Sequence, residues 1–234
     1  MSDFEKLLNE RYSCRGFKPD PVPKEKIEKI LRLAQRTPSW SNTQPWQVVI
    51  ASGAAKDALR EALLEAVAKD GSGGHGGKPD FPYPREYRGE HLARRRACGF
   101  ALYEAVGVKR GDREAGDRQR LENFRFFGAP HVAIVTTDEA IGVYGAIDCG
   151  AYVNNFMLAA WQEGVATIAQ AALAGCADVI RAQLGIPAER AVVCGISFGY
   201  EDPAHPANGF RTNRAELAEV VTRVTRAPSK PKGP

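Results

Sequence analysis

The sequence predicts an α+β protein in which helices surround a few short strands. Along residues 24–36 the apolar residues recur at helical spacing, which is typical of an amphipathic helix. Residues 142–163 carry only two charged side chains, Asp148 and Glu163. A helix that is apolar on nearly every side is buried in the domain centre or in a subunit interface. Short apolar and β-branched runs predict strands at 47–51, 131–136, 165–170 and 191–198.

Size and composition describe an ordinary soluble globular protein. The chain has 234 residues, 44% of them hydrophobic, which is enough for one sizeable core. It contains no run of about 18 or more apolar residues, and its first residues lack the order of a signal peptide. We therefore expect no membrane partner and a cytoplasmic location. The net charge of +4 is mild, so we also expect no nucleic-acid partner.

We expect a single domain over residues 1–226 and a disordered Pro/Lys-rich tail over 227–234. Within the domain, residues 80–120 are first aromatic and then strongly charged, with a helix expected near 91–107. This segment has too little apolar surface for a core of its own, so it reads as an inserted flap or lid. Lids often border active sites, so the candidate substrate contacts are Phe81, Tyr83 and Arg88.

At the N-terminus a helix is expected over 3–10, followed by the segment 11–17. If that segment is extended, Arg11, Ser13 and Arg15 point to the same side, because strand side chains alternate. Two guanidinium groups and a hydroxyl on one side form a good phosphate receptor. The alternative is a polar surface face.

Residues 37–46 connect the amphipathic helix at 24–36 to the first strand. Pro38 and Pro45 restrict the residues that precede them, so we expect the segment between them to be extended. It offers hydroxyls, amides and two indoles, which suit a planar heterocycle with one polar edge. The alternative is a Pro-bounded loop with a buried Trp.

Helices are also expected from the first strand to about residue 69 and over 176–184. In the apolar helix at 142–163, Gly145 and Gly150 would allow another helix to approach closely. This favours a dimer.

A hydrolase is the main rival interpretation. Gly195-Ile-Ser197-Phe-Gly199 fits the nucleophile-elbow pattern. An elbow needs a helix directly after the Ser, however, and Tyr200-Glu-Asp-Pro203 follows instead. The four histidines are solitary, so we expect no metal site.

Several short motifs occur in a specific order along the chain. They are Arg11-x-Ser13-x-Arg15-x-Phe17, Pro38-Ser39-Trp40-Ser41-Asn42-x-Gln44-Pro45-Trp46, Phe127-Gly-Ala-Pro130, Gly164-Val-Ala-Thr-Ile-Ala-Gln170, Leu184-Gly-Ile-Pro187, Gly195-Ile-Ser-Phe-Gly199-Tyr200 and Arg211-Thr-Asn-Arg214. With this pattern the chain resembles the FMN-dependent nitroreductase family from about residue 3 to 221. The Tyr83-Pro84 flap and Gln170-Ala171-Ala172 look closest to its nitrobenzoate-reductase-like branch.

The resemblance implies an intertwined homodimer with FMN sites at the interface, a mixed central sheet wrapped by helices, and exchanged C-terminal segments. It also implies which residues contact FMN. Those expected at the phosphate and ribityl chain are Arg11, Ser13, Arg15 and Arg214, with help from Arg211. Arg125 would lie near the pyrimidine edge. Pro38, Ser39 and Asn42 would reach the isoalloxazine ring from the partner subunit. The backbone of Ala169, Gln170 and Ala171 would approach the reactive N5.

The implied activity is NADPH- or NADH-dependent reduction of a nitroaromatic compound by a ping-pong hydride mechanism on FMN. Such hydride steps need no catalytic side chain, and we expect none. The resemblance leaves two alternatives open. One is reduction of a quinone, a free flavin or an enone at the same site; the other is a non-catalytic FMN-binding protein.

Overall fold

The computed structural model describes residues 1–70 and 77–225, so the tail expected at 227–234 lies outside the described residues. The helices and strands are α1 (Asp3–Glu10), α2 (Lys24–Ala34), β1 (Gln47–Ser52), α3 (Gly53–Asp70), α4 (Gly89–Ala105), α5 (Arg113–Leu121), β2 (His131–Asp138), α6 (Gly142–Gln162), β3 (Ala166–Gln170), α7 (Ala177–Leu184), β4 (Arg190–Gly199) and α8 (Leu217–Val220). The α+β class is confirmed, and each strand expected from the sequence is present.

The central sheet has the strand order β1-β2-β4-β3, and all three pairings are antiparallel. Parallel pairing within the described residues is confined to an isolated bridge between Ser13 and Thr167. A mixed sheet was expected. The parallel pairing found in the described residues is the single bridge from the N-terminal segment to β3.

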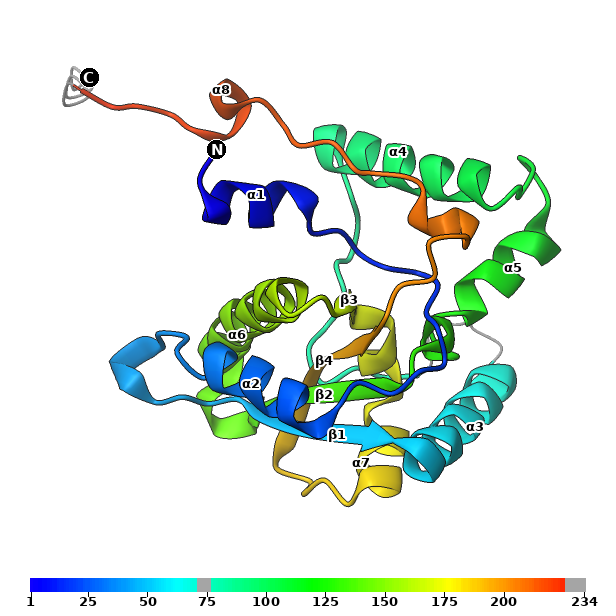
Figure 1. Cartoon of the computed structure of the whole chain (residues 1–234), viewed down its shortest axis with the longest axis vertical. Helices are drawn as coiled ribbons and strands as arrows, with labels where there is room; N and C mark the ends of the chain where they lie inside the picture. Colours follow the sequence, from blue (N-terminus) through cyan, green and yellow to red (C-terminus); the bar gives the residue numbers. More distant parts are fainter. Residues whose placement is uncertain (71–76, 226–234) are drawn as a thin grey trace, which may run out of the picture.

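Helices cover both faces of the sheet, and β2 shows why (Figure 1). Val132 and Ile134 pack into the core shared with α3 and α7, whereas Ala133 and Val135 pack into the core shared with α2 and α6. Because strand side chains alternate between faces, an unbroken apolar strand serves two cores. The expected apolar run at 131–136 thus becomes the middle of a three-layer structure.

Helix α6 is not buried on every side within one chain. Its residues Cys149, Tyr152 and Phe156 are buried, but Val143 and Ile147 are 63% and 59% exposed. Gly145 does allow a close approach, since a Cβ there would lie 2.3 Å from Thr137 Oγ1. The expectation that Gly145 serves a partner helix was therefore wrong, because it serves the packing of α6 on β2 in the same chain.

The helices α4 and α5 have no buried residues. In Figure 1, α4 lies above the sheet, near the C-terminal segment. An ion pair joins the two, with Arg94 Nη2 2.8 Å from Glu219 Oε2. The sequence did not predict α5, because it lacks an apolar period. Asp112 caps this helix by accepting from the Ala115 amide at 2.9 Å, and ion pairs lie along it.

Among the helices that the structure describes, none is both long enough and apolar enough to cross a bilayer.

Candidate functional site

The segment after α1 alternates as the sequence predicts. Tyr12 and Cys14 are buried, whereas Arg11, Ser13 and Arg15 remain partly exposed. The Cys14 amide donates to the Thr167 carbonyl at 3.0 Å, which ties the segment to the edge strand β3. The extended conformation therefore places the two guanidinium groups and the hydroxyl on one side.

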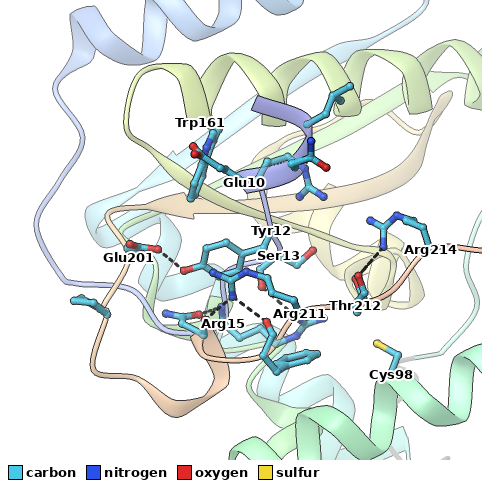
Figure 2. A pocket seen from close by; sticks show the side chains of 16 residues that line it. Glu10, Tyr12, Ser13, Arg15, Cys98, Trp161, Glu201, Arg211, Thr212 and Arg214 are labelled. Atoms are coloured by element: carbon cyan, nitrogen blue, oxygen red, sulfur yellow. Dashed lines mark hydrogen bonds between the residues drawn. The ribbon is translucent and has the colours of Figure 1, made fainter. Parts of the chain in front are cut away.

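These side chains open onto a cavity of about 860 Å³. Two more of the expected residues, Arg211 and Arg214, line the same cavity from the C-terminal segment (Figure 2). The structure thus brings together five residues from opposite ends of the chain: Arg11, Ser13, Arg15, Arg211 and Arg214.

The cavity has the electrostatics of an anion site. Arg11 Nη1 is buried and has no hydrogen-bond partner among the described residues. Burial, followed by the charge of Arg214, lowers the pKa of Arg11, and burial lowers the pKa of Arg15. Clustered cations and an unpaired buried donor are costly without a counter-charge. A phosphate-type anion fits this set of donors, because arginine forks match its oxygens.

Aromatic side chains hold two of the arginines in place. The Arg211 guanidinium lies 3.7 Å from the centre of the Tyr12 ring, and Arg15 lies 5.5 Å from that of Phe210. The Tyr12 hydroxyl donates a hydrogen bond to the Glu201 carboxylate, and burial raises the pKa of Tyr12. Tyr12, Phe210 and Glu201 were not among the site residues predicted from the sequence. Tyr12 could have been found from the sequence, because it occupies an inward-facing position of the alternating segment 11–17.

The loop that carries Pro38, Ser39 and Asn42 does not line this cavity. The expectation of an extended segment was wrong there. Residues Trp40–Asn42 form a 3-10 turn, and Ser41 and Asn42 have φ values of 48° and 57°. The turn closes because Ser39 Oγ accepts from the Gln44 amide at 2.9 Å. Non-glycine residues with positive φ are strained and cluster at functional sites.

The two indoles of this loop have different environments. Trp46 is buried, stacks on Tyr152 at 5.1 Å and donates from Nε1 to Gln35 Oε1 at 3.0 Å. Trp40 is 59% exposed and packs edge-on against Tyr144 of α6 at 4.4 Å. Trp46 is therefore a core residue, and only Trp40 is available at the surface.

At the end of β3, Ala169 and Ala171 are exposed, whereas the side chain of Gln170 is buried. Tyr83 reaches this loop from residues 80–120, and its hydroxyl donates to the Ala171 carbonyl at 3.0 Å. Of the three candidate substrate contacts, Tyr83 thus lies beside the 169–171 loop.

The other two candidate contacts lie elsewhere. Phe81 lines a separate cavity of about 500 Å³ that also includes Glu139 and Asp178. Arg88 is exposed and pairs with Glu86. Arg125, the expected residue for the pyrimidine edge, also lies outside the arginine cavity and pairs with Glu122 at 2.7 Å.

The nucleophile-elbow pattern has a structural explanation. Ser197 lies inside β4, is 0% exposed and donates from Oγ to Gln170 Oε1 at 2.5 Å. A serine with no exposed surface cannot attack a substrate. The hydrolase alternative therefore has no support from this residue.

The α+β fold places an arginine-lined cavity between the N- and C-terminal segments, and its donors suit a phosphate-type anion. The chain matches the model of the Nitroreductase family over residues 8–200. It belongs to that family.

Individual members of the family are similar in sequence to this protein over almost the whole chain. Nitroreductase NfnB of Mycolicibacterium smegmatis is 41% identical over 224 residues, which cover 95% of this chain and 92% of the relative. A 4-nitrobenzoate reductase of Nocardioides sp. (strain LMS-CY) is 34% identical over 94% of this chain and 89% of its own. The crystal structure of the FMN-dependent nitroreductase NfnB from Mycobacterium smegmatis in complex with NADPH superposes with a TM-score of 0.88. That match has 40% identity and covers 95% of this chain and 98% of the other.

Proposed function

We propose that this protein is an FMN-dependent oxidoreductase that uses NADPH or NADH to reduce nitroaromatic compounds. The observation that carries the proposal is the cavity with four arginines, in which a buried Arg11 nitrogen has no hydrogen-bond partner in the described part of the chain. The relatives support it, since one of them is named a 4-nitrobenzoate reductase and another is an FMN-dependent enzyme in complex with NADPH.

The arginines and Ser13 would hold the phosphate of FMN. Arg11 and Arg15 project from one side of an extended segment, and Arg211 is fixed over the Tyr12 ring, so little conformational entropy remains to be lost on binding. Bound FMN supplies the hydride chemistry between nicotinamide and acceptor. The chain contributes position and charge: Ala169–Ala171 present backbone at an exposed strand end, and Tyr83 secures that end through the Ala171 carbonyl.

We also propose that the active protein is a homodimer. Apolar side chains lie exposed along one face of α6, among them Val143, Tyr144 and Ile147, and Trp40 continues this face. A second copy of the chain would bury this surface, and it would carry the Pro38–Asn42 loop to the other subunit's flavin. The cytoplasmic location and the single domain with a flap over 80–120 stay predictions.

The test is a visible absorption spectrum of the purified protein, taken before and after anaerobic addition of NADPH and of NADH. We expect flavin bands that bleach with at least one nucleotide and return when a nitroaromatic compound is added. Bands that persist with both nucleotides would indicate the non-catalytic FMN-binding protein. Bleaching with reoxidation only by quinones, free flavins or enones would identify the other reductase. A colourless protein that takes up no FMN would overturn the proposal.

A further inference from the structure

Gln170 differs from its neighbours at the end of β3. Its side chain is 2% exposed, whereas Ala169 and Ala171 are exposed. The strand pairing places Gln170 opposite Gly195 of β4, and Gln170 is buried there between two exposed alanines. A buried amide needs partners for both its oxygen and its nitrogen.

Both ends of the Gln170 amide are bonded. Ser197 Oγ donates to Oε1 at 2.5 Å, and Nε2 donates to the Asn123 carbonyl at 2.7 Å. A hydroxyl on one side and a carbonyl on the other fix which atom of the amide faces which partner. The side chain therefore has one orientation that satisfies every group.

The Asn123 carbonyl belongs to a strained turn. It also accepts from the Phe126 amide at 3.2 Å, and Phe126 and Phe127 have φ values of 57° and 53°. Non-glycine residues with these angles persist only where surrounding contacts hold them. Arg125 lies on the same turn, so the Gln170 amide links this turn to the 169–171 loop.

We propose that Gln170 is a positioning residue, which holds the 169–171 loop and the Arg125 turn at a fixed separation. This inference depends on the proposed function, which puts those two segments along the reactive and pyrimidine edges of the flavin. Gln170 acts through its side chain away from the ligand, and Ser197 orients it. The role of the inward-facing Ser197 is therefore to orient the Gln170 side chain.

The test compares four variants with the wild type, with FMN affinity measured by fluorescence titration and flavin reduction by anaerobic stopped flow. Gln170→Leu keeps the side-chain size but loses both bonds, and we expect flavin reduction to slow roughly tenfold and FMN affinity to fall. Ser197→Ala removes one bond and should have a smaller effect in the same direction. Thr137→Val is the matched control. Thr137 is buried like Gln170, but it pairs with Ala191, at the other end of β4 from Ser197. This variant should bind FMN like the wild type.

Gln170→Glu separates positioning from general stability. A protonated carboxyl can accept from Ser197 and donate to the Asn123 carbonyl, whereas a carboxylate would face that carbonyl with a second acceptor. We expect this variant to approach wild-type binding and reduction at about pH 5.5 and to lose both at about pH 8, each relative to the wild type at the same pH.

The outcomes separate the two proposals. A wild type that binds no FMN would overturn the proposed function. A wild type that binds and is reduced, beside a Gln170→Leu protein with the same affinity and rate, would overturn the positioning role alone. If Gln170→Leu fails to fold, Gln170→Glu decides, and equal behaviour at both pH values relative to the wild type would contradict the proposal.

Discussion

Arg11 has a buried donor for which a bound anion would provide the acceptor. Its Nη1 is buried without a partner among the described residues, and Arg214 adds a second positive charge nearby. A folded chain tolerates such a group when an anion completes it, because the arrangement is then a set of charge-assisted hydrogen bonds. We therefore expect anion binding to stabilise the segment 11–17.

Arg15→Ala should weaken FMN binding by about 1.5–3 kcal/mol, the range for a hydrogen bond to a charged group. This corresponds to a Kd roughly 10- to 150-fold higher. Fluorescence titration of the apoprotein with FMN measures the change. Arg32→Ala is the control, because Arg32 is exposed on α2 and makes only a 3.7 Å ion pair with Glu28. Equal affinity in the two variants would place Arg15 outside the phosphate site.

His131 predicts a pH dependence of stability. Its Nε2 accepts from the Val22 amide at 2.9 Å, which requires a neutral ring, and burial lowers the pKa of His131 from 6.5. A lowered folded-state pKa contributes stability that is present above about pH 6.5 and is lost as pH falls towards the folded pKa. Urea unfolding at about pH 7.5 and pH 5.5 should show this loss in the wild type.

His131→Gln is the comparison for that experiment, because its amide oxygen can accept from the Val22 amide but does not titrate. Its free energy of unfolding should change less between the two pH values. An equal change in both proteins would assign the pH dependence to other groups.

At the scale of elements, one carboxylate joins the start of the 80–120 segment to the sheet and α7. Asp80 accepts from Arg181 Nη1 at 2.6 Å, from Nη2 at 3.1 Å and from the Val192 amide at 2.7 Å. Asp80 and Arg181 are both largely shielded, so this bidentate pair is worth more than an exposed one. It fixes the end of the segment from which Tyr83 reaches Ala171.

Asp80→Asn should release that end, because the amide loses the charge and one of the acceptor oxygens. We expect a loss of about 1–3 kcal/mol in local stability. Hydrogen exchange of residues 77–88 would report it as faster exchange. Asp178→Asn is the matched control, since Asp178 also binds Arg181 but is 88% exposed. Unchanged exchange in Asp80→Asn would show that other contacts hold the segment.

At the scale of the whole molecule, one face of the central helix α6 exposes apolar side chains. The solvent-facing side of a surface helix normally carries polar residues, yet on α6 this side carries Val143, Tyr144 and Ile147. The proposed dimer interface would account for an apolar helix that is only partly buried in one chain.

Ile147→Glu should convert the proposed dimer to a monomer, because dimerisation would then remove a charge from water. Light scattering after size-exclusion chromatography measures the mass, and FMN retention should fall together with it. Leu33→Glu on α2 is the control, since Leu33 is 44% exposed and outside the α6 face. A wild type that is already monomeric, with bound FMN, would contradict the dimer proposal.

The sequence by itself determined most of the local structure. Apolar periods predicted the main helices and strands, and alternation alone placed Arg11, Ser13 and Arg15 on one side, because these signals depend on neighbours within a few residues. Family resemblance was needed to add Arg211 and Arg214. The charged helix α5 was not predicted, because a helix that is capped and rich in ion pairs shows no apolar period in its sequence.

Only the tertiary structure decided which groups meet. It placed Arg214 beside Arg11, turned Ser197 inward to Gln170, and buried Trp46 while leaving Trp40 exposed. It also replaced the expected extended loop at 38–45 by a strained turn. The physical reason is that periodicity specifies which side chains share a face, whereas their partners come from segments far away in the sequence.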